Sequence, residues 1–200
     1  MTLAFRVAWV AENFEQLDQT DEFHPLYANP RRQGAGRVDN PSQYATLYLA
    51  RSGAAACGEV FGDLQPIPAS ALVHRGRADV TRCLIRVHLP DTLTLIDYDD
   101  AAVLQERGVR PSDVVRRDRE ATQQLALGDF LRRRQSGARG VAWWSYHHPA
   151  WRPLALWSDE LDDDRWFADV HAEQVEPLTL DHPELVVAAA TLRRDLEPDS

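Results

Sequence analysis

Three side chains that can bind or stabilise a charged group lie at equal spacing in the first third of the chain. Arg37 follows a glycine in a loop rich in Gly, Asp and Asn, Tyr48 lies in a short apolar run, and Glu59 follows a run of alanines. Each is eleven positions from the next. Arginine and tyrosine donate hydrogen bonds, and a carboxylate stabilises positive charge that develops during a reaction. The spacing allows all three to face one cleft.

The elements that would carry these residues are predictable from local composition. Residues 18–43 are rich in Asp, Pro, Asn, Gly and Arg, which is typical of a long irregular segment. Residues 45–50 favour a short buried strand. Ser52 is suited to cap a helix that runs to about Phe61 and carries Glu59. Taken singly, an Arg, a Tyr or a Glu in such elements is usually structural or solvated.

The rest of the chain mixes short strands with helices. Pro90-Asp91 predicts a turn that makes the strands on either side of it neighbours. Leu125, Leu127, Phe130 and Leu131 are expected to supply the apolar contacts of the longest helix. A first strand, which carries Arg6, is expected over residues 3–10. Further strands are expected over 82–89, 92–96, 140–146 and 154–157, and helices over 100–107, 118–134 and 183–196.

This pattern predicts an α+β fold in one domain spanning residues 1–200, with short and partly antiparallel strands. No G-x-G-x-x-G turn opens a helix after the first strand, so a dinucleotide would be bound without a Rossmann fingerprint. The two cysteines, Cys57 and Cys83, lie in separate apolar segments without metal-ligand spacing, and we expect buried free thiols and no metal.

Several of these segments resemble the RES domain, a family named for its Arg, Glu and Ser. Its Gly-Arg loop, its Tyr-Leu-Ala strand and the small-residue helix that bears the Glu correspond to Arg37, Tyr48 and Glu59 here. Residues 140–145 resemble the family strand that carries Ser145, and Arg6 lies in a segment similar to its opening strand. The resemblance covers about residues 4–160. Val38 stands where the family often has an aromatic residue.

The resemblance implies a fold similar to the ADP-ribosyltransferases and an enzyme that cleaves NAD⁺ at the nicotinamide–ribose bond. Glu59 would be catalytic, because a carboxylate stabilises the oxocarbenium character of the ribose. Arg37 and Arg6 would bind the diphosphate. Tyr48 would stack on or hydrogen bond the nicotinamide riboside, and Ser145 would bind the ribose or hold Glu59 in place.

The resemblance also implies partners. It predicts the toxin of a bacterial toxin–antitoxin pair, an Xre-like antitoxin that covers the site, and a homodimer. NAD⁺ would be a substrate rather than a cofactor, with water or inorganic phosphate as the acceptor. The net charge of −9 and pI of 5.2 argue against direct nucleic-acid binding. The chain has neither a leader segment nor a long apolar run, so we expect a cytoplasmic protein without a membrane span.

Other functions remain open at this stage. The same fold would suit a transferase that attaches ADP-ribose to a macromolecule. A non-catalytic interaction module would use the Trp-rich face of Trp143, Trp144 and Trp151. His147-His148 raises the alternative of a metal hydrolase, although neighbouring residues of a strand point to opposite faces. The acidic run at residues 159–164 lacks the glycine and final Glu of a calcium loop, and favours a solvated turn.

Overall fold

The computed structural model describes residues 2–28, 31, 33–115, 119–158, 167 and 169–198. Seven strands form one sheet in the order β5-β6-β7-β2-β1-β4-β8, in which only the β5–β6 pair is parallel. The sheet strands are β1 (Thr2–Ala11), β2 (Thr46–Ala50), β4 (Val80–Leu89), β5 (Thr94–Asp97), β6 (Ala138–Ala142), β7 (Pro153–Trp157) and β8 (His171–Pro177).

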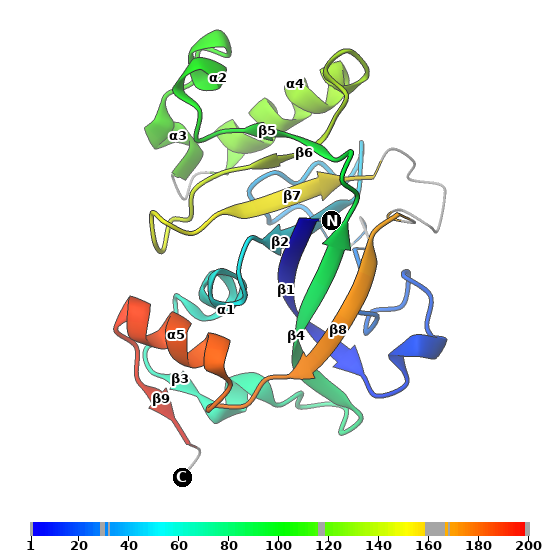
Figure 1. The fold of residues 1–200 in the computed structure, drawn as a ribbon, viewed down its shortest axis with the longest axis vertical. Helices are drawn as coiled ribbons and strands as arrows, with labels where there is room; N and C mark the ends of the chain where they lie inside the picture. Colours follow the sequence, from blue (N-terminus) through cyan, green and yellow to red (C-terminus); the bar gives the residue numbers. More distant parts are fainter. Residues whose placement is uncertain are drawn as a thin grey trace.

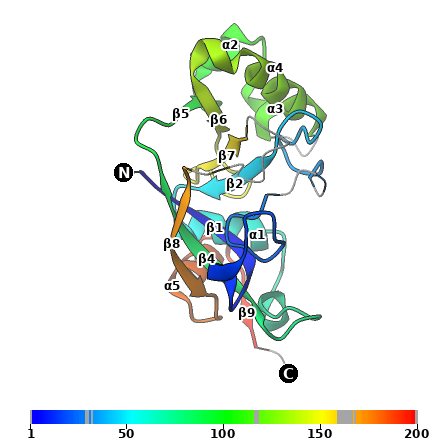
Figure 2. The ribbon, with the colours of Figure 1, turned by 90° about the vertical axis from the view of Figure 1, so that its right-hand side faces the viewer.

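Helices cover the two halves of this sheet separately (Figure 1). The helices are α1 (Gly53–Phe61), α2 (Ala101–Glu106), α3 (Pro111–Val115), α4 (Glu120–Ser136) and α5 (Pro183–Leu192). The short elements are η1 (Phe14–Gln16), η3 (Ala69–Leu72) and a parallel pair of β3 (Ile67–Pro68) with β9 (Leu196–Glu197). Both views place α2, α3 and α4 at one end of the molecule, and α1 and α5 beside β1 and β4 (Figure 2).

The two halves of the sheet meet at a single residue pair. The described register joins β1 to β2 only at Phe5 and Ala50, whereas β1 pairs with β4 from Thr2 to Ala11. Beyond Phe5 the two strands diverge, and we call the space between residues 6–11 of β1 and 46–49 of β2 the fork. Antiparallel neighbours that separate in this way leave an opening between two sheet halves.

Helix α1 begins directly after β2 and packs across the sheet beside the fork. Ser52 caps it as expected, because its Oγ accepts a hydrogen bond from the backbone N–H of Ala55 at 3.2 Å. Its small residues, Ala54, Ala55 and Gly58, are buried and allow a close approach to the layers beneath. A Cβ on Gly58 would lie 1.9 Å from the ring of Trp151, so only glycine fits there.

The expected α+β fold is confirmed, and so is the expectation that Cys57 and Cys83 are buried free thiols. The expectation that the strands flanking Pro90-Asp91 are neighbours is wrong. Strand β5 instead pairs with β6 in the opposite sheet half, because the four residues between β4 and β5 cross from one half to the other.

Three smaller expectations also need correction. The last helix ends at Leu192 because Arg193 adopts a left-handed φ of 54°, and the chain then enters β9. The strand expected over 140–146 is β6, Ala138–Ala142, so Ser145 follows a strand rather than lying in one. Leu131 is 63% exposed, and the buried contacts of α4 come from Ala126 and Phe130. The described part of α4 begins at Glu120.

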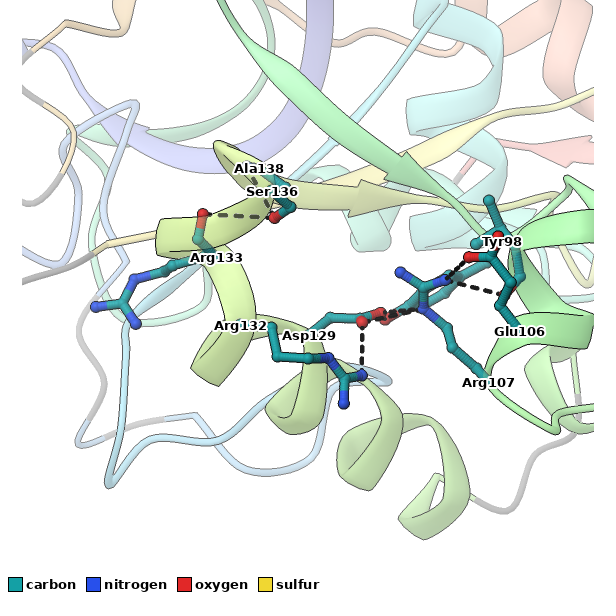
Figure 3. Close-up of polar contacts among 9 residues, drawn as sticks. Tyr98, Glu106, Arg107, Asp129, Arg132, Arg133, Ser136 and Ala138 are labelled. Carbon is teal, nitrogen blue, oxygen red and sulfur yellow. Dashed lines mark hydrogen bonds and ion pairs between the residues drawn. The ribbon is translucent and has the colours of Figure 1, made fainter.

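A buried ion-pair network fixes α4 to the neighbouring helix layer (Figure 3). Asp129 of α4 is 1% exposed, and it accepts hydrogen bonds from Tyr98 Oη at 2.9 Å and from Arg107 Nε at 2.9 Å. Arg132 reaches the same carboxylate at 3.1 Å from the solvent side. The carboxylate therefore joins α4 to the residues that directly follow β5 and α2. It is the buried counterion of Arg107, whose other ion-pair partner in the described residues, Glu106, is 77% exposed.

We expect the two cationic partners of Asp129 to contribute different amounts to the free energy of unfolding. Asp129→Ala leaves the Arg107 side chain, 17% exposed, with the exposed Glu106 as its remaining ion-pair partner among the described residues, and should lower the free energy of unfolding by roughly 3–5 kcal/mol in urea denaturation. Arg132→Ala removes a partner that is 59% exposed and should cost less than about 1 kcal/mol. Equal losses in the two variants would contradict this account.

Candidate functional site

A cavity of about 410 Å³ opens in the fork. We call it the fork cavity. It is bounded by β1 and β2, by α1, by the loop before β2, and by the connection between β6 and β7. Among its lining residues are four with polar side chains expected from the sequence to bind substrate or to catalyse: Arg6, Arg37, Tyr48 and Glu59.

Glu59 projects from α1 into this cavity and is held at one oxygen. Ser145 Oγ donates a hydrogen bond to Glu59 Oε1, and Ser145 is itself 3% exposed. The backbone N–H groups of His147 and His148 donate to Ser145 Oγ at 2.9 and 3.4 Å. The serine hydroxyl has one proton, so two backbone donors commit that proton to the carboxylate. Ser145 therefore positions Glu59 and does not line the cavity.

Arg37 faces Glu59 across the fork cavity. Burial lowers the pKa of the Arg37 guanidinium, the nearby Glu59 carboxylate raises it, and Arg119 lowers it further. One Arg37 nitrogen donates to the carbonyl oxygen of Val114. Arg119 also lines the cavity, and it donates to the carbonyl of Ala35. Three guanidinium groups, those of Arg6, Arg37 and Arg119, thus line one cavity with the carboxylates of Glu59 and Asp63, in a protein whose net charge is −9.

The loop that carries Arg37 is built around a buried carboxylate. Asp39 is 5% exposed, and its Oδ2 accepts hydrogen bonds from the backbone N–H groups of Gly34 at 2.9 Å and Gly36 at 2.6 Å. Its Oδ1 accepts from Tyr48 Oη at 2.7 Å. A Cβ on Gly36 would lie 2.2 Å from that tyrosine oxygen, so the turn closes only with glycine there.

Helix α4 supports the same loop from the other side. Gln123 Nε2 donates to the carbonyl of Gly36 at 2.7 Å, and Thr122 Oγ1 donates to the carbonyl of Arg37 at 2.7 Å. Asn40 Nδ2 donates in return to the carbonyl of Gln123 at 2.9 Å. The backbone on both sides of Arg37 is therefore fixed before any ligand binds.

Tyr48 lines the fork cavity, and its hydroxyl is engaged by hydrogen bonds within the protein. The hydroxyl donates a hydrogen bond to Asp39 and accepts one from the backbone N–H of Val38 at 3.1 Å, so its donor and its acceptor both have partners. Burial and the neighbouring Asp39 carboxylate raise the pKa of Tyr48 well above its ordinary value, so the hydroxyl stays protonated. Trp143 packs edge-on against the tyrosine ring, with centroids 6.3 Å apart. The side chain suits contact with a flat ligand ring.

Arg6 lies at the floor of the fork and is bound to protein. Its two terminal nitrogens donate to the carbonyls of Pro25 at 3.2 Å and Tyr27 at 2.7 Å. Burial lowers the pKa of Arg6 to about 10, which still leaves it charged at neutral pH. Its charge contributes to the field in the cavity, while its hydrogen bonds hold the segment after Phe23 against β1.

The structure thus gathers Arg6, Arg37, Tyr48 and Glu59 at one cavity and places Ser145 behind Glu59. Asp39, Arg119 and Gln123 were missed by sequence reasoning, although Arg119 lines the cavity and the other two support the Arg37 loop, and His147 was considered only as a possible metal ligand. The position of Asp39, two residues after Arg37 in a Gly-rich loop, was the available signal. No sequence signal pointed to Arg119, because more than 60 residues separate it from β2.

The residues of the alternative sites considered from the sequence do not come together as those sites would require. His147 lines the fork cavity, but His148 packs on Trp151 with ring centroids 5.3 Å apart. Within the described residues, no group of three or more His, Cys, Asp or Glu side chains is arranged to hold a metal ion. Trp143 and Trp151 are 4% and 8% exposed and do not form a surface platform. The acidic run at 159–164 lies outside the described residues.

Comparisons with known proteins bear on the family and the fold. The RES domain family matches residues 6–181. Among solved structures, a chain of the M. tuberculosis MbcT-MbcA toxin-antitoxin complex is similar in fold, with a TM-score of 0.57 and 17% sequence identity over 89% of this chain and 84% of that chain. No curated protein matches the sequence. In the described part of the chain, no helix has the length and apolar character needed to cross a membrane.

We expect Gly36→Ala to disturb the loop that carries Arg37. The added Cβ would overlap the Tyr48 oxygen and the Asp39 carboxylate, and overpacking of this kind costs about 1–3 kcal/mol. The melting temperature should fall by several degrees. Gly76→Ala is the matched control, because its Cβ would meet only His74 at an ordinary 3.5 Å. An unchanged melting temperature in Gly36→Ala would show that the loop is not rigid.

Proposed function

Because the chain belongs to the RES domain family, we propose that it is the toxin of a bacterial toxin–antitoxin pair and that it destroys NAD⁺. The reaction is cleavage of the bond between nicotinamide and ribose. The observation that carries this proposal is the placement of Glu59, which Ser145 holds by one oxygen in a cavity shared with Arg37.

Glu59 acts on the ribose. As nicotinamide departs with the electron pair of the glycosidic bond, positive charge develops on the ribose, and an adjacent carboxylate lowers the energy of that state. Ser145 donates a hydrogen bond to Oε1 of Glu59, so Oε2 faces the sugar or orients the water or phosphate that accepts it. When water is the acceptor, the products are nicotinamide, ADP-ribose and a proton. When inorganic phosphate attacks, the sugar carries a phosphate instead.

The diphosphate of the substrate lies among the cations on the other side of the cavity. Arg37 and Arg119 offer N–H donors of the geometry that suits phosphate oxygens, and Arg6 adds charge from the floor. The Arg37 loop is fixed by Asp39 and by α4, so little ordering is needed on binding. The ring of Tyr48 contacts the nicotinamide riboside by stacking, since its hydroxyl is already engaged.

A partner that covers the fork cavity would inhibit the enzyme. The structural similarity to a chain of a toxin-antitoxin complex supports such a partner. Val60 and Tyr146 line the cavity and are 40% and 54% exposed, so apolar surface for a protein contact is present at its rim. An Xre-like antitoxin, a homodimer and a cytoplasmic location stay predictions of the family resemblance.

We expect Glu59→Gln to abolish loss of NAD⁺ by the purified protein while the fold is retained. Glutamine preserves the size of the side chain but not the charge that stabilises the ribose cation, and a loss of two or more orders of magnitude in kcat is expected. Products are measured by chromatography in phosphate and in phosphate-free buffer, which identifies the acceptor.

The control for this variant is Glu15→Gln, an equal change at an exposed position outside the fork cavity. Undiminished turnover in Glu59→Gln would remove the residue from the reaction. Wild-type protein that consumes NAD⁺ only when a macromolecule is present, with the ADP-ribose attached to it, would instead identify a transferase.

Arg37→Ala tests the cationic side of the cavity. If Arg37 binds the diphosphate equally in the ground and transition states, KM should rise at least tenfold with kcat nearly unchanged. Arg75→Ala, at an exposed position outside the cavity, should leave both constants unchanged. A fall in kcat with constant KM would place Arg37 in the chemical step and contradict the binding role.

A further inference from the structure

Attack by water on the ribose releases a proton that a base in the fork cavity must receive. Among the described side chains that line the cavity, the bases are Glu59, Asp63 and His147, since arginine already carries its proton. Ser145 engages Oε1 of Glu59, and the other oxygen is directed at the reacting sugar. Asp63 is exposed, whereas His147 is half-buried. Imidazole exchanges protons near neutral pH, so the chemistry of the cavity favours His147.

His147 lies beside the same face of α1 as Glu59. A Cβ on Gly62 would lie 2.6 Å from His147 Nδ1, so the imidazole rests against the end of that helix. Gly62 follows Glu59 by three positions, which places the two on one helix face. The backbone N–H of His147 donates to Ser145 Oγ at 2.9 Å, and that hydroxyl donates to Glu59. One serine therefore fixes both the carboxylate and the backbone that carries the imidazole.

The imidazole of His147 is open to a ligand. Among the residues that the structure describes, its nitrogens make no hydrogen bond, and its ring contact is with Tyr146, at 5.6 Å between centroids. Other histidines use Nδ1 to accept the backbone N–H two residues later, and these are His24, His74, His148 and His182. At His147 that position is Pro149, which has no N–H to donate. The imidazole is therefore not committed to the local turn.

The end of α1 suits the charge that proton transfer creates on the imidazole. His147 contacts Gly62, the C-cap of α1, and positive charge is favoured at the C-terminus of a helix. The carboxylates of Glu59 and Asp63 line the same cavity, while Arg37 faces Glu59 from across it. An imidazolium at this place is therefore closest to groups of opposite charge on its own side of the cavity.

We propose that His147 is a catalytic residue that takes the proton of the attacking water. This inference rests on the proposed function, because it assumes that the ribose lies at Glu59. The water oxygen bonds to the anomeric carbon as the bond from that carbon to nicotinamide breaks, and the bonding electron pair leaves with nicotinamide. The electron pair of the water O–H bond stays on the new hydroxyl oxygen. The proton passes to an imidazole nitrogen and then to solvent.

The test compares water with a nucleophile that has no proton to lose. Nicotinamide release from NAD⁺ is measured in phosphate-free buffer with and without azide. His147→Gln should lower kcat for the reaction with water about 100-fold, the scale of one general base. KM should change by less than about twofold, since the imidazole contacts the acceptor rather than NAD⁺. Azide should return nicotinamide release to within about threefold of wild type, with ADP-ribosyl azide as the product.

The matched control is His171→Gln, the same change at an exposed position outside the fork cavity, which should leave both reactions unchanged. Glu59→Gln should stay inactive with azide, because the charge on the ribose is still not stabilised. Circular dichroism and melting temperature establish that each variant is folded. His147→Asn decides the question if His147→Gln does not fold.

The proposal is overturned if His147→Gln releases nicotinamide at the wild-type rate, or if it slows the reactions with water and azide equally, as a structural role would. It is also overturned if the wild-type protein consumes NAD⁺ only with inorganic phosphate. A loss that azide restores in Asp63→Asn, without one in His147→Gln, would assign the proton to Asp63. Failure of the proposed function has a different signature, because the wild-type protein would then release no nicotinamide in either buffer.

Discussion

The site depends on one constraint, the pairing of β1 with β2 at Phe5 and Ala50 alone. That pair holds the sheet together, and the divergence of the strands beyond it creates the fork. Each sheet half has its own helical cover and its own apolar cluster, with α1 and α5 on one and α4 on the other. The fork cavity lies where the halves separate, so groups from both can face the same ligand without filling the space as core.

Glu59 and Arg37 lie on opposite sides of the cavity, and the Glu59 side is fixed by contacts from both halves of the molecule. Glu59 comes from a helix whose alanines and Gly58 allow close packing, and Ser145 sets its orientation. Arg37 comes from a loop that is closed by Asp39 and supported by Gln123. Because backbone and buried side chains make these contacts, the site is preorganised, and binding energy is not used to order it.

Preorganisation also explains why buried polar groups cluster here. Asp39, Ser145 and Asp129 are almost fully buried, and each makes several hydrogen bonds. Ser145 holds the catalytic candidate, Asp39 holds the loop, and Asp129 fixes the helix that supports the loop. A buried polar group with all partners in place stabilises one geometry, since any alternative leaves it unsatisfied. In this chain such groups lie where they set the positions of Glu59 and of the Arg37 loop.

The sequence by itself determined the local features: the Ser52 cap, the α1 helix, the strands around Arg6 and Tyr48, and the residue types of the site. Those depend on propensity and on contacts between near neighbours. Only the tertiary structure decided that β5 crosses to β6, that Arg119 joins Arg37, and that Ser145 binds Glu59. These outcomes depend on pairing between distant segments, whose free energy comes from packing and burial that no local pattern encodes.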